Sequence, residues 1–290
     1  MSETAAKHQD RATTAWLPAA LWTKCRIEAQ LLLFSLAAVN FVFSIVYVWL
    51  TSQVDLGALA TFLRALPESF ERVAGVPFGA IATPTGRLAM AYVDPVTVFT
   101  AVAWGIARGS DCISGELGRG TMELLLAQPV RRSAVVVVQG IVTTIGSILI
   151  AASSWLGMWV GVHFTDLAGS VDSWRFVPSA LNLFGFMFFI AGFSTLASAC
   201  GRDRRRTVGF VAGFYLVQVL MKVVGRAATG WEALLYGTFI TVFEPQYLAI
   251  HPDTAWADVA GANGLLILLG LLSYAAATLI FCRRDLPAPL

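Results

Sequence analysis

The sequence predicts an all-α integral membrane protein with six transmembrane helices, and three observations support this prediction. Of the 290 residues, 57% are hydrophobic and only 13% are charged, whereas soluble domains carry roughly 25% charged residues. Six apolar runs are each long enough to cross a hydrocarbon layer about 30 Å thick. Basic residues gather in alternate connecting segments, which is the pattern that orients membrane helices. A soluble helical protein is disfavoured, because its core would not need so many uninterrupted apolar runs.

The apolar runs set the order of the spans and the orientation of the chain. They lie at residues 31–50, 88–107, 134–160, 178–199, 208–224 and 265–281. If the N-terminus is cytoplasmic, most of the 20 lysines and arginines fall in inner segments, and the others are scattered over long outer segments. Long outer segments tolerate such charges during translocation. We therefore predict that both termini are cytoplasmic.

The segment before the first span, residues 16–30, mixes apolar side chains with Lys24, Arg26 and Glu28. It is too short and too polar to cross a membrane, but it suits the membrane interface. We predict an interfacial N-terminal helix here, and the alternative is a plain helical extension of the first span. Residues 1–15 are polar and lack the pattern of a cleaved signal peptide.

Two outer segments are long enough to hold structure of their own. Residues 51–87 combine an apolar stretch at helical spacing with a tail rich in glycine and proline, which predicts one or two short surface helices. Within residues 225–262, the mostly apolar run 231–243 is too short to cross and is ended by Glu244 and Pro245. A re-entrant segment entering from the outside is the preferred interpretation. The alternative, a seventh span, would place the basic C-terminus outside.

Ionisable residues near the spans have structural explanations. Asp94 precedes Pro95 at the start of the second span, where an acidic residue caps a helix and proline suits the first turn; a place on a substrate path is the alternative. Lys222 and Arg226 lie one turn apart near the outer end of the fifth span. Long basic side chains at such a position are expected to snorkel to the interface.

The most informative segment is the polar loop at residues 111–133, between the second and third spans. Thr121 is available as a helix cap, Leu124 and Leu125 begin an apolar face, and Pro129 is placed to end a short helix. Such a polar, turn-forming segment is costly inside a bilayer but suited to a water-exposed docking surface. We predict a short capped cytoplasmic helix. A loop helix without a partner is the alternative.

Residues 116–132 read Glu-x-x-x-Gly-Thr-x-Glu-Leu-Leu-Leu-x-x-Pro-Val-x-Arg. This string resembles the first cytoplasmic loop of ATP-binding-cassette (ABC) type-2 transporter permeases, which carry similar Gly-Glu, Gly-Thr-x-Glu-Leu-Leu-Leu and Pro-Val-x-Arg motifs. Two positions depart from the family pattern, because Gly118 stands where a charged residue is common and Arg131 adds a second base. Outside the loop the resemblance is architectural, and it covers most of the chain.

The resemblance implies that residues 1–290 form a single permease domain and that the loop helix is a coupling helix. In the family this helix fits a groove on a separate cytosolic ATPase. The implied ATPase-coupling residues are Glu116, Arg119, Gly120, Thr121, Glu123, Leu124, Leu125, Pro129 and Arg132. The implied partners are two ATPase subunits, which bind ATP and Mg, and a second permease copy or homologue in a bacterial plasma (inner) membrane.

The second inner loop is strongly basic. Its four arginines are a possible second cytoplasmic contact: Arg202, Arg204, Arg205 and Arg206. They are candidates to dock acidic residues of the same ATPase or to bind anionic lipid headgroups. A pure topology anchor is the alternative.

Several kinds of site are not predicted. The sequence has no Gly-x-x-x-x-Gly-Lys-Ser/Thr string, so we expect no nucleotide or other cofactor on this chain and no ATPase activity of its own. The three histidines lack the spacing of a metal site, although His163 with Asp166 is a weak hint. Neither a Gly-x-Ser-x-Gly nor a His-Glu-x-x-His string occurs, so the sequence does not indicate an intramembrane hydrolase. The net charge of +2 does not indicate a nucleic-acid partner. The four cysteines lie near one predicted membrane face, where disulfides are not expected.

The sequence thus predicts a permease that exports an amphipathic, lipid-like or drug-like substrate. The alternatives are a stand-alone membrane enzyme or secondary transporter without an ATPase, and an ABC complex with a mechanical or sensory output. An intramembrane acidic pair would favour the stand-alone protein, and none is evident in the sequence.

Overall fold

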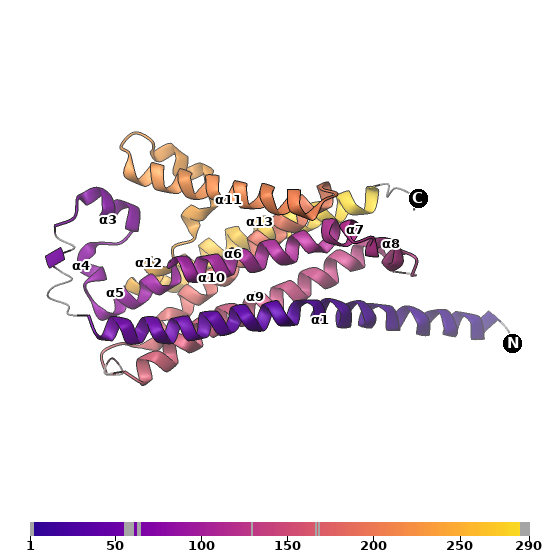
Figure 1. Ribbon diagram of the computed structural model, residues 1–290, viewed down its shortest axis with the longest axis horizontal. Helices are drawn as coiled ribbons and strands as arrows, with labels where there is room; N and C mark the ends of the chain where they lie inside the picture. Colours follow the sequence, from indigo (N-terminus) through magenta and orange to yellow (C-terminus); the bar gives the residue numbers. More distant parts are fainter. Residues whose placement is uncertain are drawn as a thin grey trace.

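The computed structural model describes residues 3–54, 61–62, 65–128, 130–165, 167 and 169–284. Every regular element in these residues is a helix. The long helices run along the long axis of the molecule, and both chain ends lie at the end that holds α7 (Glu116–Gly118) and α8 (Thr121–Leu126) (Figure 1). We call this the α8 end. The opposite end, which holds α3 (Glu68–Ala74), is the α3 end.

Six described helices are long and apolar enough to cross a membrane, which confirms the six predicted spans. The second span is the helical stretch Pro84–Gly118, which includes α6 (Pro95–Ser110). The other five lie in α1 (Glu3–Ser52), α9 (Arg132–His163), α10 (Val177–Cys200), α11 (Arg204–Ala227) and α13 (Ala255–Arg283). These helical stretches extend beyond the predicted apolar runs by different amounts, for example by one residue at each end of α10 but by ten residues at the start of α13.

The centre of the bundle is α10, which packs against α6, α9 and α13. Small residues allow the close approach: a Cβ on Gly109 would lie 2.5 Å from the Cβ of Ser194, and one on Gly192 would lie 2.7 Å from the carbonyl oxygen of Gly270. Such small-residue contacts are typical of membrane helices. By contrast, α1 and α11 lie at the periphery, and each exposes a broad apolar face.

The predicted separate interfacial helix at residues 16–30 is wrong, because this segment continues without a break into the first span. Residues 19–52 contain neither glycine nor proline, so no residue favours ending the helix. In addition, the ammonium of Lys24 in this extension pairs with Glu116 of the bundle. Figure 1 shows α1 running straight past the other helices at the α8 end.

The first outer segment holds α3, α4 (Phe78–Ile81) and the start of α5 (Pro84–Ala89). Much of the apolar stretch predicted there as a surface helix lies outside the described residues. The capping role of Asp94 is confirmed, because its carboxylate accepts a hydrogen bond from the amide of Val96 at 2.9 Å and Pro95 begins α6.

The second outer segment is a chain of short helices: η4 (Glu232–Gly237), η5 (Phe239–Val242) and α12 (Pro245–Ile250). A seventh span is excluded for these residues by their length. Phe239 is buried against Phe186 and Phe189 of α10, with ring centroids 6.2 and 4.5 Å away. The segment therefore turns back against the bundle. A re-entrant position in the membrane stays a prediction.

Lys222 and Arg226 do not snorkel, contrary to the prediction from their position. The ammonium of Lys222 donates to the carbonyl oxygens of Ile240 and Phe243, each at 2.9 Å, and lies 3.3 Å from a carboxylate oxygen of Glu244. Arg226 is also paired with Glu244. Because these partners come from the second outer segment, the two basic residues fix that segment to α11.

Candidate functional site

The polar loop begins with a short π-helix, η2 (Asp111–Gly115), at the end of α6. π-Helical turns are rare, and they are frequently found at functional sites. The hydroxyl oxygen of Ser198 on α10 accepts hydrogen bonds from the amides of Ile113 and Ser114, at 3.1 and 2.8 Å. These contacts satisfy backbone donors that the wider turn leaves free. The sequence analysis did not predict η2. The small residues around it were the only local indication that the regular α-helix changes there.

A sharp turn follows α7 and leads into α8. Gly120 has a φ of 70°, in the left-handed region that favours glycine. The prediction that Thr121 caps the short helix is wrong, because Gly120 occupies the capping position and Thr121 is the first helical residue. The hydroxyl of Thr121 instead donates to the carboxylate of Glu116. A short helix is nevertheless present where the loop predicted one.

The two faces of α8 differ in character. Met122 is fully buried and packs with Ile113 and Phe281, while Leu126 is partly buried against the same cluster. On the other face, Glu123 is exposed and Leu124 is 70% exposed. Leu125 is half-buried. The helix is therefore anchored on one face and exposes Glu123 and Leu124 on the other.

Glu116 joins α7 to its neighbours. Its carboxylate lies 2.6 Å from the ammonium of Lys24 on α1 and 2.9 Å from the guanidinium of Arg119. Only 6% of the Glu116 side chain is exposed, so these charge-assisted hydrogen bonds act in a largely dry environment. Glu116 therefore holds α1, α7 and the start of α8 together.

Asp111 extends this ionic network toward α11. Its carboxylate lies 2.7 Å from Arg119 and 3.6 Å from Arg204. The hydrogen bond to Asp111 raises the pKa of the Arg119 guanidinium above its ordinary value, despite the opposing effect of burial. The sequence analysis missed Asp111. The signal was an acid at the end of an apolar span, where a charge needs a partner.

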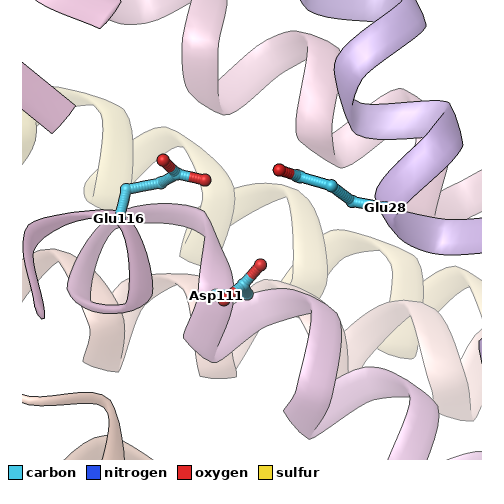
Figure 2. A group of neighbouring side chains, drawn as sticks. All are labelled: Glu28, Asp111 and Glu116. Carbon is cyan, nitrogen blue, oxygen red and sulfur yellow. The ribbon is translucent and has the colours of Figure 1, made fainter. Parts of the chain in front are cut away.

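Three carboxylates converge at this point: Glu28 from α1, Asp111 from η2 and Glu116 from α7 (Figure 2). Their oxygens lie within 4.8 Å of one another, which is the spacing of a possible metal site. However, Lys24, Arg119 and Arg204 already pair with these acids. A divalent cation would have to displace ammonium and guanidinium groups, so the donor set fits an internal ionic network better than a metal site.

The remaining candidate coupling residues are separated. The guanidinium of Arg132 donates to the carbonyl oxygen of Arg284 at 2.7 Å, so it caps the C-terminal end of α13. Pro129 lies outside the described residues, as does Asp166 of the weak histidine hint. The loop residues between 111 and 126 therefore lie together, whereas Arg132 contacts the C-terminal end of α13.

The structure also separates the four arginines of the second inner loop. Arg204 faces α6 and joins the ionic network through Asp111. Arg202 and Arg206 line a groove beside α10. Arg205 lines neither this groove nor the cavity beside the ionic network. Sequence spacing placed all four on one basic turn, but helix periodicity directs them to different neighbours.

The sequence model of one family, described as ABC-2 family transporter protein, matches residues 32–286. This chain belongs to that family. Membership and the six apolar helices together make it a multi-pass membrane component of an ABC transporter. No curated protein matches the chain. The match covers nearly all of the first apolar run, the other five spans and the α7–α8 loop. It includes Asp111, Glu116, Arg119 and Arg204 of the ionic network, whereas Lys24 and Glu28 precede it.

Proposed function

We propose that this ABC-2 family protein is the permease subunit that couples ATP hydrolysis on separate cytosolic ATPase subunits to export of an amphipathic, lipid-like or drug-like substrate. The α8 end is then cytoplasmic, and the membrane is the bacterial inner membrane. The observation that carries the coupling role is the exposed face of α8. Glu123 and Leu124 point outward from a helix whose other face is anchored by the buried Met122.

The ionic network explains how movement at α8 would reach the membrane helices. Glu116 connects α7 to α1 through Lys24, and Asp111 connects η2 to α11 through Arg204. A partner that pushes on α8 therefore acts on α1, α6 and α11 together, because these links resist separation. Rigid-body movement of packed helices is a common route from a ligand-driven change to a distant site.

The peripheral helices support the proposed assembly and cargo. Only 17% of the apolar window is buried in α1 and in α11, against 72% in α10. Such faces fit lipid or a second permease copy, and a pathway between two copies would present apolar walls to an amphipathic substrate. ATP and Mg would be bound by the two ATPase subunits, since this sequence has no phosphate-binding loop of the Walker type.

The coupling role is tested by affinity purification of the tagged chain from its native membrane in mild detergent, with mass spectrometry and an ATPase assay. We expect the wild-type chain to retain an ABC ATPase with vanadate-sensitive activity. Glu123→Lys reverses a charge on the exposed face of α8 and should lower ATPase recovery by roughly tenfold, since removing an interface charge costs on the order of 1–2 kcal/mol. Glu232→Lys, an exposed acid at the α3 end, is the matched control and should keep full recovery.

Two outcomes would overturn the proposal. If the intact wild-type chain reproducibly retains no ATPase, a stand-alone enzyme or secondary transporter becomes the better explanation. If an ATPase is retained equally by wild type, Glu123→Lys and Glu232→Lys, α8 is not its contact. Substrate-stimulated ATPase activity separates export from a mechanical or sensory output.

A further inference from the structure

A groove at the α8 end lies between α10, α11 and the end of α13, on a different side of α11 from the ionic network. It has a volume of about 820 Å³. Phe193, Leu196 and Ala197 line it from α10, with Cys200 one turn further along. This spacing places the four side chains on one face of the helix. The groove was not anticipated by the sequence analysis, because its walls come from segments far apart in the chain.

The groove changes from apolar to basic along its length. Phe193 lies seven residues before the end of α10, which is about 10 Å along the helix, and its ring stacks on Phe210 of α11 with centroids 6.2 Å apart. Arg206 lies one turn before Phe210, and Arg202 precedes α11. The aromatic part is therefore inside the spanning segments, and the arginines are at the helix ends, where a headgroup region begins.

The basic end of the groove has unused hydrogen-bond donors. Arg202 and Arg206 are exposed, and within the described part of the chain neither side chain has a hydrogen-bond or ion-pair partner. Arg284 is held in place because one of its terminal nitrogens donates to the carbonyl oxygens of Ala199 and Gly201, at 2.7 and 2.8 Å. No carboxylate is among the described residues that line the groove. Three guanidinium groups without a counter-ion favour a phosphate-bearing anion.

We propose that this groove is a binding site for an anionic phospholipid of the adjacent leaflet. The acyl chain lies along the apolar wall formed by Phe193 and Phe210, and the headgroup phosphate is bound by Arg202, Arg206 and Arg284. An ATPase surface fits less well, because the aromatic part is at membrane depth and is accessible to a lipid chain. The proposal needs only a membrane-embedded chain, so it stands or falls independently of ATPase coupling.

The test uses the full chain, delipidated in detergent, and native mass spectrometry to titrate dioleoyl phosphatidylglycerol against dioleoyl phosphatidylcholine. We expect the wild-type chain to bind the anionic lipid roughly tenfold more tightly than the zwitterionic lipid. The double variant Arg202→Ala/Arg206→Ala should lose this preference. Arg205→Ala removes an exposed arginine of the same loop that does not line the groove, and it should keep the preference.

A second pair of variants tests the apolar part. Phe210→Ala shortens the apolar wall, so it should weaken the binding of both lipids severalfold without changing their ratio. Leu216→Ala, which removes an exposed side chain elsewhere on α11, should change neither affinity. Glycerol phosphate added as a soluble headgroup should not displace phosphatidylglycerol at equal concentration, because it lacks the acyl chain.

Three results would overturn the proposal. The first is equal binding of the two lipids by the wild-type chain, which needs no variant to observe. The second is an unchanged preference in the double variant, or an equal loss in Arg205→Ala. The third is full displacement by glycerol phosphate, which would identify a site for free anions. Size-exclusion profiles of all variants establish that they remain folded.

Discussion

At the scale of single residues, the loop holds two acids with opposite environments. Glu116 is buried and has Lys24, Arg119 and Thr121 as partners. Glu123 is exposed, and its side chain has no partner in the part of the chain that the structure describes. The first acid therefore stabilises the fold of the loop, and the second is free to meet another protein.

Glu116→Gln should lower the thermal stability of the purified chain. The substitution keeps the shape but removes the charge that balances Lys24 and Arg119, and losing charge-assisted hydrogen bonds of a part-buried group costs about 1–3 kcal/mol. Glu123→Gln, an isosteric change on the exposed face, should stay within about 0.5 kcal/mol of wild type. Unfolding in detergent, followed by the fluorescence of the nine tryptophans, measures both. Equal midpoints for the two variants would show that the network around Glu116 contributes little.

At the scale of elements, the second outer segment depends on contacts with α11. Lys222 is half-buried and donates to two carbonyl oxygens of the segment, those of Ile240 and Phe243. Unpaired buried carbonyl groups are costly, so this single side chain stabilises η5 and the residues that follow it.

Lys222→Met should loosen this segment while the bundle stays folded. The variant keeps a long apolar stem but leaves two carbonyl groups and part of the Glu244 charge unpaired. We expect amide hydrogen exchange within residues 232–250 to become roughly tenfold faster, which corresponds to about 1.4 kcal/mol of local stability. Arg175→Met, an exposed basic residue at the same end, should leave exchange unchanged. Unaltered exchange in Lys222→Met would mean that the segment is held by its aromatic contacts alone.

The sequence predicted some elements well and others poorly, for physical reasons. The six spans are visible because hydrophobic length is a local property, and the cap at Asp94 is visible because it involves adjacent residues. The pairing of Lys222 depends on partners about 20 residues away, and the hydrogen bonds of η2 depend on Ser198 of another helix. The loop motif located the short helix, but the distant partners Lys24 and Arg204 could not be read from spacing.

At the scale of the whole molecule, both chain ends lie at the α8 end (Figure 1). The ionic network and the basic groove lie at the same end. The concentration of lysine and arginine there predicts that this end is cytoplasmic. The exposed Cys200 and Cys282 lie at this end, whereas Cys25 and Cys112 are buried.

A membrane-impermeant maleimide applied to intact cells should therefore leave the wild-type chain unlabelled. Asp253→Cys places an exposed thiol at the α3 end and should be labelled from outside. After the membrane is permeabilised, Cys200 and Cys282 should also react. Labelling of the wild-type chain in intact cells, with Asp253→Cys adding nothing, would reverse the orientation and place α8 on the outside.

The central claim is that the exposed face of α8 contacts a cytosolic ATPase. The most direct measurement is photocrosslinking in native membranes with benzoylphenylalanine at Leu124, which is 70% exposed. The control carries the same group at Trp256, which is 59% exposed near the α3 end. We predict that Leu124 forms an adduct with an ABC ATPase and that Trp256 does not. A Leu124 site that crosslinks only to lipid or to this chain, in a complex that still contains an ATPase, would contradict the account.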